Sequence, residues 1–380
     1  MAFRCDGERM KILYICPTDP RVTAYGGQQR THVIWKGLRT VGDVWTIVPV
    51  PHKWQEERDE EYRIYKLCLE RRYSPGWFAQ RLFSRFLPQM AVPWGTTLDP
   101  IRRIGVDFDV VVMRYLRMAG LTRAWKIAPL FVDVDDTPTV EYTLAHPTHR
   151  FRQWLLRKWQ NRLCARAKLL WVPDPEQIND LKPFKAAHLP NIPVGDISPV
   201  DRSRADPNRL LFLGYLAHRP NIVALDWFLE KFWEELKLRF PNLQLDVVGG
   251  GLPEEYKIKW SSYSDVTLHG FVQDVVPFFE RSLALVTPMK IGSGTCIKVL
   301  ESLARGTPVI STEQGLRGVD KAYRVAKNGI YSFNTLAGIE DCIANLRKKP
   351  FPSVARGFLS ACYSQDNITN TLISGMKSAS

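Results

Sequence analysis

The segment from Pro288 to Thr312, PMKIGSGTCIKVLESLARGTPVIST, constrains the fold of this chain most strongly, because its hydrophobic period changes twice. Residues 283–289 (LALVTPM) form an apolar run with β-branched members that predicts a buried strand. Apolar residues then recur at helical spacing over 297–304, Gly306 follows where a helix ends, and 308–312 predicts a second strand. The segment therefore predicts a strand–loop–helix–strand unit.

The loop of this unit, Gly292 to Thr295, places two residues without a Cβ immediately before the helix. Backbone N–H groups and the positive end of the helix dipole favour an anion there. Lys298 and Glu301 follow on neighbouring parts of one helical face. A lysine can approach a pyrophosphate, and a carboxylate can accept two hydrogen bonds from a ribose diol. The segment therefore predicts a nucleotide-diphosphate site, and the alternative is a tight turn with a solvated Lys–Glu pair.

Length and composition indicate more than one domain. The 380 residues are 45% hydrophobic, which is enough for two sizeable cores. The sequence contains no run of about 18 apolar residues, so no transmembrane helix is predicted. The start, whether Met1 or Met10, lacks the apolar stretch of a signal peptide, so we expect a cytoplasmic protein. The seven cysteines contain no Cys-x-x-Cys pair, which argues against a zinc site or a disulfide framework.

Strand and helix patterns alternate in two halves. The strands predicted in the first half are 11–16, 44–50, 108–114 and 129–136, with a glycine-bearing loop at 17–30 and a helix at 31–42. Those in the second half are 210–214, 243–251 and 266–272, followed by the unit described above. A polar, proline-rich linker lies at 190–207. We therefore predict an α/β fold with two Rossmann-like domains, 1–195 and 208–350, facing across a cleft, and a helical segment at 351–380 that packs back on the first domain.

The second half also resembles a known family. It contains, in order, LFLG, VVGGG, LHGFVQD, VTPMKIGSGTCIKVLESLARGTPVIST and GLRGV, and this series is similar to that of family-four retaining glycosyltransferases, group-1-type sugar transferases with the GT-B fold. The resemblance covers 210–319 well and parts of the first half loosely. It implies transfer of a sugar from a nucleotide-diphosphate sugar, bound by the second domain, to an acceptor hydroxyl on the first, without a cofactor or a metal.

The resemblance assigns roles within the donor site. Glu301 matches the second glutamate of the family's Glu-x7-Glu motif, which holds the donor ribose, and Ser293 stands where the first, sugar-contacting glutamate is expected. Tyr215 replaces an arginine that often follows LFLG, which leaves Arg219 and Lys298 to neutralise phosphate. The implied donor-binding residues are Gly26, Gly27, Arg219, Gly270, Phe271, Val272, Gly292, Ser293, Gly294, Thr295, Lys298 and Glu301. Gly270 to Val272 would read the nucleobase through the backbone, so the base is not specified.

The first half supplies further candidates. Gly26, Gly27 and Arg30 resemble the family's glycine loop, where positive charge would face a leaving pyrophosphate, and the alternative is a common loop with a solvated arginine. The Asp-Val-Asp at 133–135 looks like the metal motif of another glycosyltransferase architecture. We nevertheless predict no metal site, and expect Asp135 or Asp136 to contact donor or acceptor hydroxyls. The resulting catalytic candidates are Arg30, Asp135, Lys298 and Glu301.

The charge distribution bears on the acceptor. Residues 1–200 contain 30 Lys and Arg against 21 Asp and Glu, and residues 201–380 contain 22 against 18. Two stretches, 78–90 and 149–168, combine an apolar face with arginines, as in helices that lie on an anionic membrane, and the alternative is a face buried in the domain. We expect peripheral contact with the inner face of the membrane, and a glycan or lipid-linked acceptor in envelope or exopolysaccharide synthesis.

Other functions remain open at this point. A sugar-nucleotide epimerase can share this fold, and a non-catalytic relative could bind sugar nucleotides, given Ser293. A dinucleotide oxidoreductase would need a Gly-x-Gly-x-x-Gly turn after a strand, which neither glycine loop supplies. No nucleic-acid partner is expected, because the basic residues form no recognisable binding module.

Overall fold

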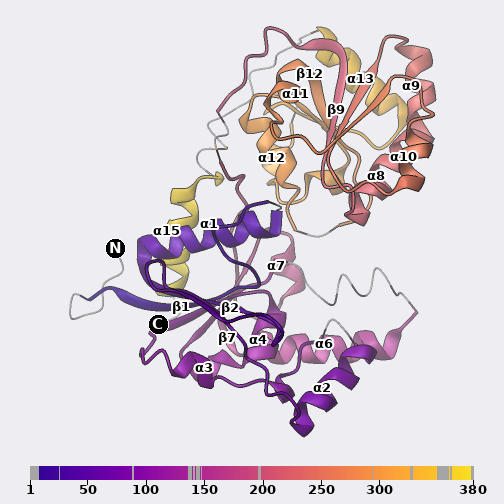
Figure 1. Ribbon diagram of the computed structural model, residues 1–380. Helices are drawn as coiled ribbons and strands as arrows, with labels where there is room; N and C mark the ends of the chain where they lie inside the picture. Colours follow the sequence, from indigo (N-terminus) through magenta and orange to yellow (C-terminus); the bar gives the residue numbers. More distant parts are fainter. Residues whose placement is uncertain are drawn as a thin grey trace. The chain divides into compact units, whose positions relative to one another are not determined.

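The computed structural model describes residues 8–24, 26–87, 90–135, 139, 142, 146, 148–195, 198–292, 294–325, 328–348, 359 and 362–377. The chain divides into two compact units, Met1–Pro190 with Gln365–Ser380, and Asn191–Ser364. Each unit, taken by itself, is a mostly parallel sheet with helices packed around it (Figure 1). The α/β class predicted for both halves is confirmed.

The first unit is built on an eight-stranded sheet. Its strands are β1 (Met10–Ile15), β2 (Gly42–Pro49), β3 (Glu57–Asp59), β4 (Ile64–Leu67), β5 (Val110–Arg114), β6 (Leu130–Asp133), β7 (Ala167–Val172) and β8 (Ala186–His188). Their order is β3-β4-β2-β1-β5-β6-β7-β8, and only the β3–β4 pair is antiparallel. The central strands are mostly apolar and buried over Ile12–Ile15 and Val110–Arg114, as expected for a parallel sheet covered on both faces. The strand order reverses between β1 and β5.

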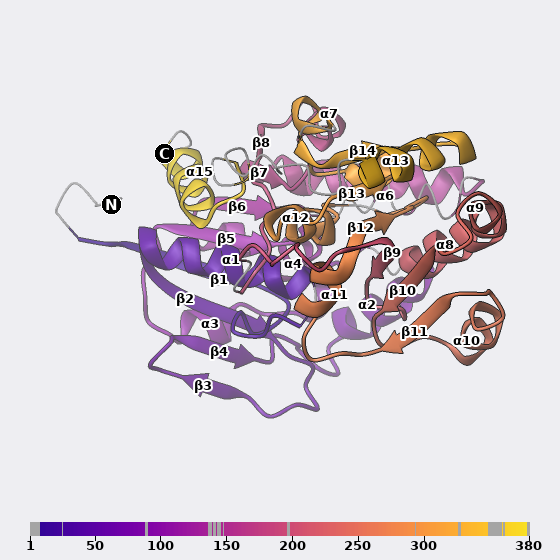
Figure 2. The ribbon, with the colours of Figure 1, turned by 90° about the horizontal axis from the view of Figure 1, so that it is seen from above.

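Helices cover this sheet. They are α1 (Gly26–Val41), α2 (Pro75–Phe86), α3 (Asp99–Arg102), α4 (Leu116–Thr122), α6 (Arg150–Cys164), α7 (Gln177–Asp180) and α15 (Gln365–Lys377), with short 3-10 turns η1 (Pro93–Gly95) and η2 (Ala124–Lys126). The last helix, α15, lies beside α1 (Figure 1, Figure 2). Gln365 Nε2 donates to the carbonyl of Val33 at 3.1 Å, and Leu372 packs where a Cβ on Gly37 would be 2.9 Å from its Cδ1.

The second unit is built on a six-stranded parallel sheet. Its strands are β9 (Asp206–Leu213), β10 (Gln244–Val248), β11 (Val266–Gly270), β12 (Ser282–Thr287), β13 (Val309–Ser311) and β14 (Ile330–Ser332), in the order β11-β10-β9-β12-β13-β14. Its helices are α8 (Arg219–Phe228), α9 (Glu234–Arg239), α10 (Glu254–Trp260), α11 (Val276–Arg281), α12 (Ile297–Ala304) and α13 (Leu336–Lys348), with a short π-helix at Leu229–Trp233 and 3-10 turns at Glu313–Leu316 and Lys321–Tyr323. The predicted strand–loop–helix–strand unit is β12, α12 and β13.

One boundary differs from its prediction in a way that matters for the site. The helix expected at 31–42 begins at Gly26, so Gly26 and Gly27 form its first turn and are not part of the preceding loop. The two glycines obscured the start of the helix, because glycine has low helix propensity. As a result Arg30 lies on the helix face that is buried against the sheet.

Candidate functional site

The strand order of the second unit indicates where a ligand binds. From β9 the chain runs outward through β10 and β11, and then crosses back to place β12 on the other side of β9. In open α/β sheets, ligands bind beyond the carboxyl ends of the strands at such a reversal. The segments at this point are Gly214, which follows β9, and the loop that follows β12.

Glycine is required by the backbone of this loop. Gly292 has φ +133° and Gly294 has φ +65°, conformations that L side chains rarely adopt. The loop runs directly into α12, whose first N–H groups have no partner within the helix. Gly292, Gly294 and Thr295 are described, whereas the predicted Ser293 lies outside the described residues. The donor-binding role of these four residues stays a prediction.

A turn after β13 holds the glycine loop. Gln314 Nε2 donates to the carbonyl of Gly292 at 2.8 Å, and the N–H of Cys296 donates to the carbonyl of Arg317 at 3.3 Å. The Arg317 guanidinium lies against Gly292, since a Cβ there would be 2.6 Å from its Nη2. The turn contains the GLRGV sequence of the family resemblance, which assigns no role to Arg317. It is a cation directly beside the predicted phosphate loop.

Lys298 of α12 contacts the segment that follows β9. Its Nζ donates to Oδ1 of Asn221 at 2.8 Å, and Asn221 Nδ2 donates to the carbonyl of Tyr215 at 2.8 Å. Gly214 permits this approach, because a Cβ there would be 2.8 Å from the ammonium nitrogen. Burial lowers the pKa of Lys298, and the charge of Arg317 lowers it further. Asn221 is 7% exposed, and sequence reasoning missed it because a Pro-Asn pair reads as a helix start.

Glu301 lies one turn further along α12. Its Oε1 accepts hydrogen bonds from Nε and Nη2 of Arg305, at 3.2 and 3.1 Å. Within the described part of the chain, Oε2 accepts none. The side chain is 22% exposed, so this second oxygen is available to a ligand. The ribose-binding role predicted for Glu301 is compatible with this geometry and is not tested by it.

Glycines also bring the ends of β9, β10 and β11 together. The N–H of Gly249 donates to the carbonyl of Gly270 at 2.8 Å, and a Cβ on Gly249 would lie 1.7 Å from the carbonyl oxygen of Gly214. Two aromatic side chains are exposed at this edge, Tyr215 at 61% and Phe271 at 79%. Arg219 is exposed in the first turn of α8, and no described contact joins it to the glycine loop.

The first unit has a buried polar cluster at the carboxyl ends of β5 and β6. Arg30 is 2% exposed, and its Nε donates to both carboxylate oxygens of Asp133, at 2.9 and 3.1 Å. Its Nη2 donates to the carbonyl of Leu189 at 3.0 Å. Arg114 also pairs with Asp133, and its Nη2 donates to Asp135 Oδ2 at 2.9 Å. Arg30 is therefore a buried ion-pair member and not the solvated arginine that the alternative interpretation required.

The other predicted residues of this unit lie nearby. Burial alone would raise the pKa of Asp135, but Arg114 and Arg30 outweigh it and hold the pKa below its ordinary value. The carbonyl of Gly27 accepts from Thr31 Oγ1 at 2.9 Å and from Arg114 Nη2 at 3.3 Å. Asp136 lies outside the described residues. Among the residues that are described, no cluster of three or more His, Cys, Asp or Glu side chains is placed to hold a metal.

Comparisons with known proteins bear first on the second unit. Residues 207–346 match the family model described as "Glycosyl transferases group 1". The matched segment contains Asn221, the glycine loop and α12. Comparison with curated proteins finds no match.

Solved structures bear on the fold of the whole chain. HepE from Anabaena, solved in complex with UDP, is 13% identical with a TM-score of 0.64, over 97% of this chain and 100% of that one. WaaG, described as a glycosyltransferase involved in lipopolysaccharide biosynthesis, is 15% identical with a TM-score of 0.58, over 97% and 98%. TarM is 14% identical with a TM-score of 0.53 over 70% of this chain, which spans 54% of TarM.

The fold is therefore that of the GT-B glycosyltransferases, as predicted from the sequence. The family match adds that residues 207–346 of the second unit are similar to a group 1 glycosyltransferase domain.

Proposed function

We propose that this protein is a retaining glycosyltransferase that moves a sugar from a nucleotide-diphosphate sugar to an acceptor hydroxyl. The observation that carries the proposal is the placement of Lys298 and Arg317 beside the Gly292–Thr295 loop at the strand reversal of a group 1 domain. Two cations and a set of backbone N–H groups match the charge of a diphosphate.

Different residues of the second unit bind the diphosphate, the ribose and the base of the proposed donor. The loop N–H groups and Lys298 bind the diphosphate, and Glu301 accepts hydrogen bonds from the ribose through Oε2. The base lies near Gly270–Val272, where Phe271 and Tyr215 offer exposed rings for stacking. Because HepE was solved in complex with UDP and with UDP-glucose, UDP sugars are the first donors to test.

The proposed chemistry uses electrostatic stabilisation of the leaving nucleotide. An acceptor hydroxyl attacks on the face that the nucleotide leaves, and the configuration of the anomeric carbon is retained. Lys298 and Arg317 stabilise the negative charge that develops on the departing phosphate. We propose that no metal is needed, since these cations supply the charge.

We assign Arg30 a positioning role. Its guanidinium is engaged by Asp133 and Leu189, so it acts on a ligand through the position of α1 and of Asp135. Asp135 is 9% exposed and its carboxylate is held ionised by Arg114, so it can accept a hydrogen bond from an acceptor hydroxyl. This gives Asp135 the more direct role of the two.

The surface of the first unit supports contact with an anionic membrane. No residue of α2 is buried, and Phe78, Leu82 and Phe86 are 55%, 71% and 39% exposed. The Arg152 guanidinium of α6 lies 4.5 Å from the ring centre of Phe86, so both amphipathic helices contribute to one surface. The apolar face predicted over 78–90 is shorter than expected, because α2 ends at Phe86 and Leu87 is fully buried. Among the described residues, no helix is long and apolar enough to cross a membrane.

Rings next to arginines suit the interface of an anionic bilayer. We therefore propose peripheral membrane contact and a glycan or lipid-linked acceptor, in envelope or exopolysaccharide synthesis. A triple substitution of Phe78, Leu82 and Phe86 to serine should lower binding to vesicles that contain phosphatidylglycerol by about tenfold or more. The control substitutes the exposed Leu238 and Ile258 of the second unit with serine and should leave binding unchanged. Equal binding by both variants would contradict the membrane proposal.

A donor screen tests the proposed function. Saturation-transfer NMR with a panel of nucleotide sugars identifies the donor, and product analysis with and without an acceptor then identifies the reaction. A glycosyltransferase gives a glycosylated acceptor with retained configuration. A changed sugar nucleotide in the absence of acceptor would instead identify an epimerase, and binding without any turnover would identify a non-catalytic relative.

A further inference from the structure

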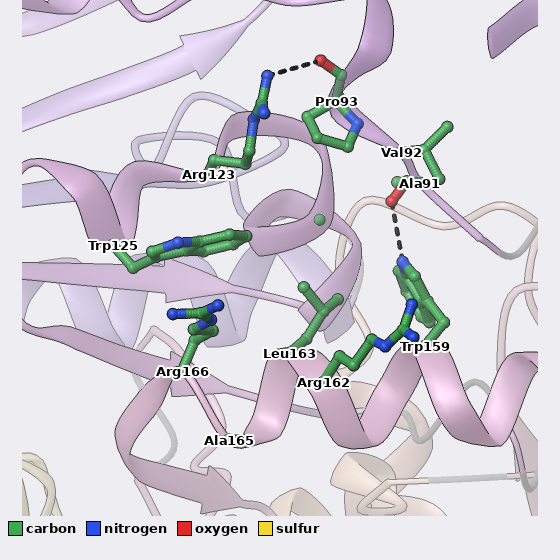
Figure 3. Close-up of a pocket in the computed structure, with 11 residues that line it drawn as sticks. Ala91, Val92, Pro93, Arg123, Trp125, Trp159, Arg162, Leu163, Ala165 and Arg166 are labelled. Atoms are coloured by element: carbon green, nitrogen blue, oxygen red, sulfur yellow. Dashed lines mark hydrogen bonds between the residues drawn. The ribbon is translucent and has the colours of Figure 1, made fainter. Parts of the chain in front are cut away.

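The first unit contains a pocket of about 500 Å³ that the proposed function does not use (Figure 3). It lies at the C-terminal ends of α4 and α6, which return the chain to the starts of β6 at Leu130 and β7 at Ala167. The polar cluster of Arg30, Arg114 and Asp133 lies at the opposite edge, where β5 and β6 end. The pocket is therefore separate from that cluster.

Apolar and aromatic groups form most of the pocket. Leu163, Ala91 and Val92 are among its lining residues, and the indoles of Trp125 and Trp159 lie on opposite sides of it in Figure 3. Such a lining favours a hydrocarbon group, because burying apolar surface is worth about 25 cal/mol per Å².

Three arginines line the same pocket. In Figure 3, Arg166 lies on the side of Trp125, and Arg162 on the side of Trp159. Arg123 Nη2 donates to the carbonyl of Pro93 at 3.2 Å. The side chains of Arg162 and Arg166 have no hydrogen bond or ion pair with any described residue, and no carboxylate is among the lining residues that the structure describes. Guanidinium groups without a carboxylate partner favour an anion.

The available hydrogen-bond acceptors argue against a sugar ring as the occupant. Sugar hydroxyls need acceptors as well as donors, but none of the described lining residues is Asp, Glu, Asn or Gln. The carbonyl of Ala91 already accepts from Trp159 Nε1 at 3.0 Å, and that of Pro93 accepts from Arg123. An anion with a hydrocarbon body fits the lining better.

We infer that this pocket binds an alkyl phosphate. Arg162 and Arg166 hold the phosphate, and the alkyl chain packs between Trp125 and Trp159. A phosphate monoester carries about −1.5 to −2 charges at pH 7, which two or three guanidinium groups can match. The inference does not depend on the proposed transferase activity.

Calorimetric titration of the full chain with octyl phosphate, kept below its micelle concentration, tests the inference. Inorganic phosphate presents the head alone, and octyl glucoside presents the same tail on an uncharged head group. Octyl phosphate should bind at least tenfold more tightly than either. Affinity should rise from butyl to octyl phosphate by up to about fourfold per buried methylene.

The double variant Arg162→Ala, Arg166→Ala should lower octyl phosphate affinity by at least tenfold. The matched control, Arg157→Ala with Lys168→Ala, removes the same charge from exposed positions that do not line the pocket, and should bind as the unchanged protein does. Saturating UDP should leave the affinity unchanged, which separates this pocket from the proposed donor site.

Three results would overturn the inference: no binding of octyl phosphate, equal affinity for inorganic phosphate, or an equal loss in both double variants. A further arm identifies the source of the ligand. Binding to dioleoyl phosphatidic acid vesicles that depends on Arg162 and Arg166 would indicate a membrane lipid, whereas binding of octyl phosphate alone would indicate a soluble phosphate ester. Either result supports the pocket chemistry.

Discussion

Lys298 is the residue on which most of the proposed donor chemistry depends. Its lowered pKa predicts how UDP affinity changes with pH. Burial and Arg317 lower that pKa, whereas a bound diphosphate favours the charged form. UDP affinity should therefore fall as the pH rises through the lowered pKa of Lys298. Calorimetry between pH 7.5 and 10 measures the decline. The variant Lys298→Arg keeps its charge over this range, so its profile should be flat, and an equal decline would contradict the assignment.

Asn221 supplies a second test at the same contact. Asn221→Ala removes the acceptor for Lys298 Nζ and should lower UDP affinity on the order of tenfold. Asn221→Asp should lower UDP affinity further, because the new carboxylate pairs with Lys298 and neutralises the positive charge that would bind the diphosphate. Thermal unfolding of both variants checks that the domain remains folded. Tighter UDP binding by the aspartate variant would contradict this role for Lys298.

Among the elements, the position of the glycine loop before α12 was predicted correctly from the sequence. The contacts that hold this loop in place were not predicted. The change from strand to helix period fixed the positions of β12, α12 and β13, because periodicity is a local property. The turn that holds the loop, with Gln314 and Arg317, comes from a later part of the chain. Such contacts depend on how strands are ordered in the sheet, which local patterns do not specify.

Alanine substitution tests the loop as an element. At Gly292 a Cβ meets Arg317 and the residue has φ +133°, so Gly292→Ala should cost about 1–3 kcal/mol of stability and lower UDP affinity. Urea unfolding and calorimetry measure both. The control is Gly195→Ala, which has φ +101° with open space around its Cβ and should leave UDP affinity unchanged. Equal loss of UDP affinity in both variants would contradict a specific role of the glycine loop in UDP binding.

The burial of Arg30 also depends on contacts that are distant in the sequence and could not be predicted from local patterns. Its position three residues after the pair Gly26-Gly27 resembled that of a phosphate-facing arginine, but the side chain is buried against Asp133. Burial of a charge depends on a partner 103 residues away, which spacing alone does not reveal. Asn221 and Arg317 were missed for the same reason, since each becomes part of the site only through contacts distant in sequence.

At the scale of the whole molecule, the two units should respond separately to substitution. Arg30→Ala leaves Asp133 buried with one partner fewer and should destabilise the first unit by about 3–5 kcal/mol. UDP binding should persist, because the residues assigned to it belong to the second unit. Chemical unfolding followed by tryptophan fluorescence, together with UDP calorimetry, measures both effects. Loss of UDP binding while the first unit stays folded would contradict the assignment of UDP binding to residues of the second unit alone.

The central claim is that a nucleotide diphosphate binds at the strand reversal of the second unit. Calorimetric titration of UDP into the unchanged protein and the double variant Lys298→Ala, Glu301→Ala tests it most directly. The control, Lys257→Ala with Glu254→Ala, removes an exposed Lys–Glu pair from α10. We predict that the first double variant weakens binding by about a hundredfold or more while the control binds as the unchanged protein does. Unchanged UDP affinity in the Lys298, Glu301 variant would contradict the account.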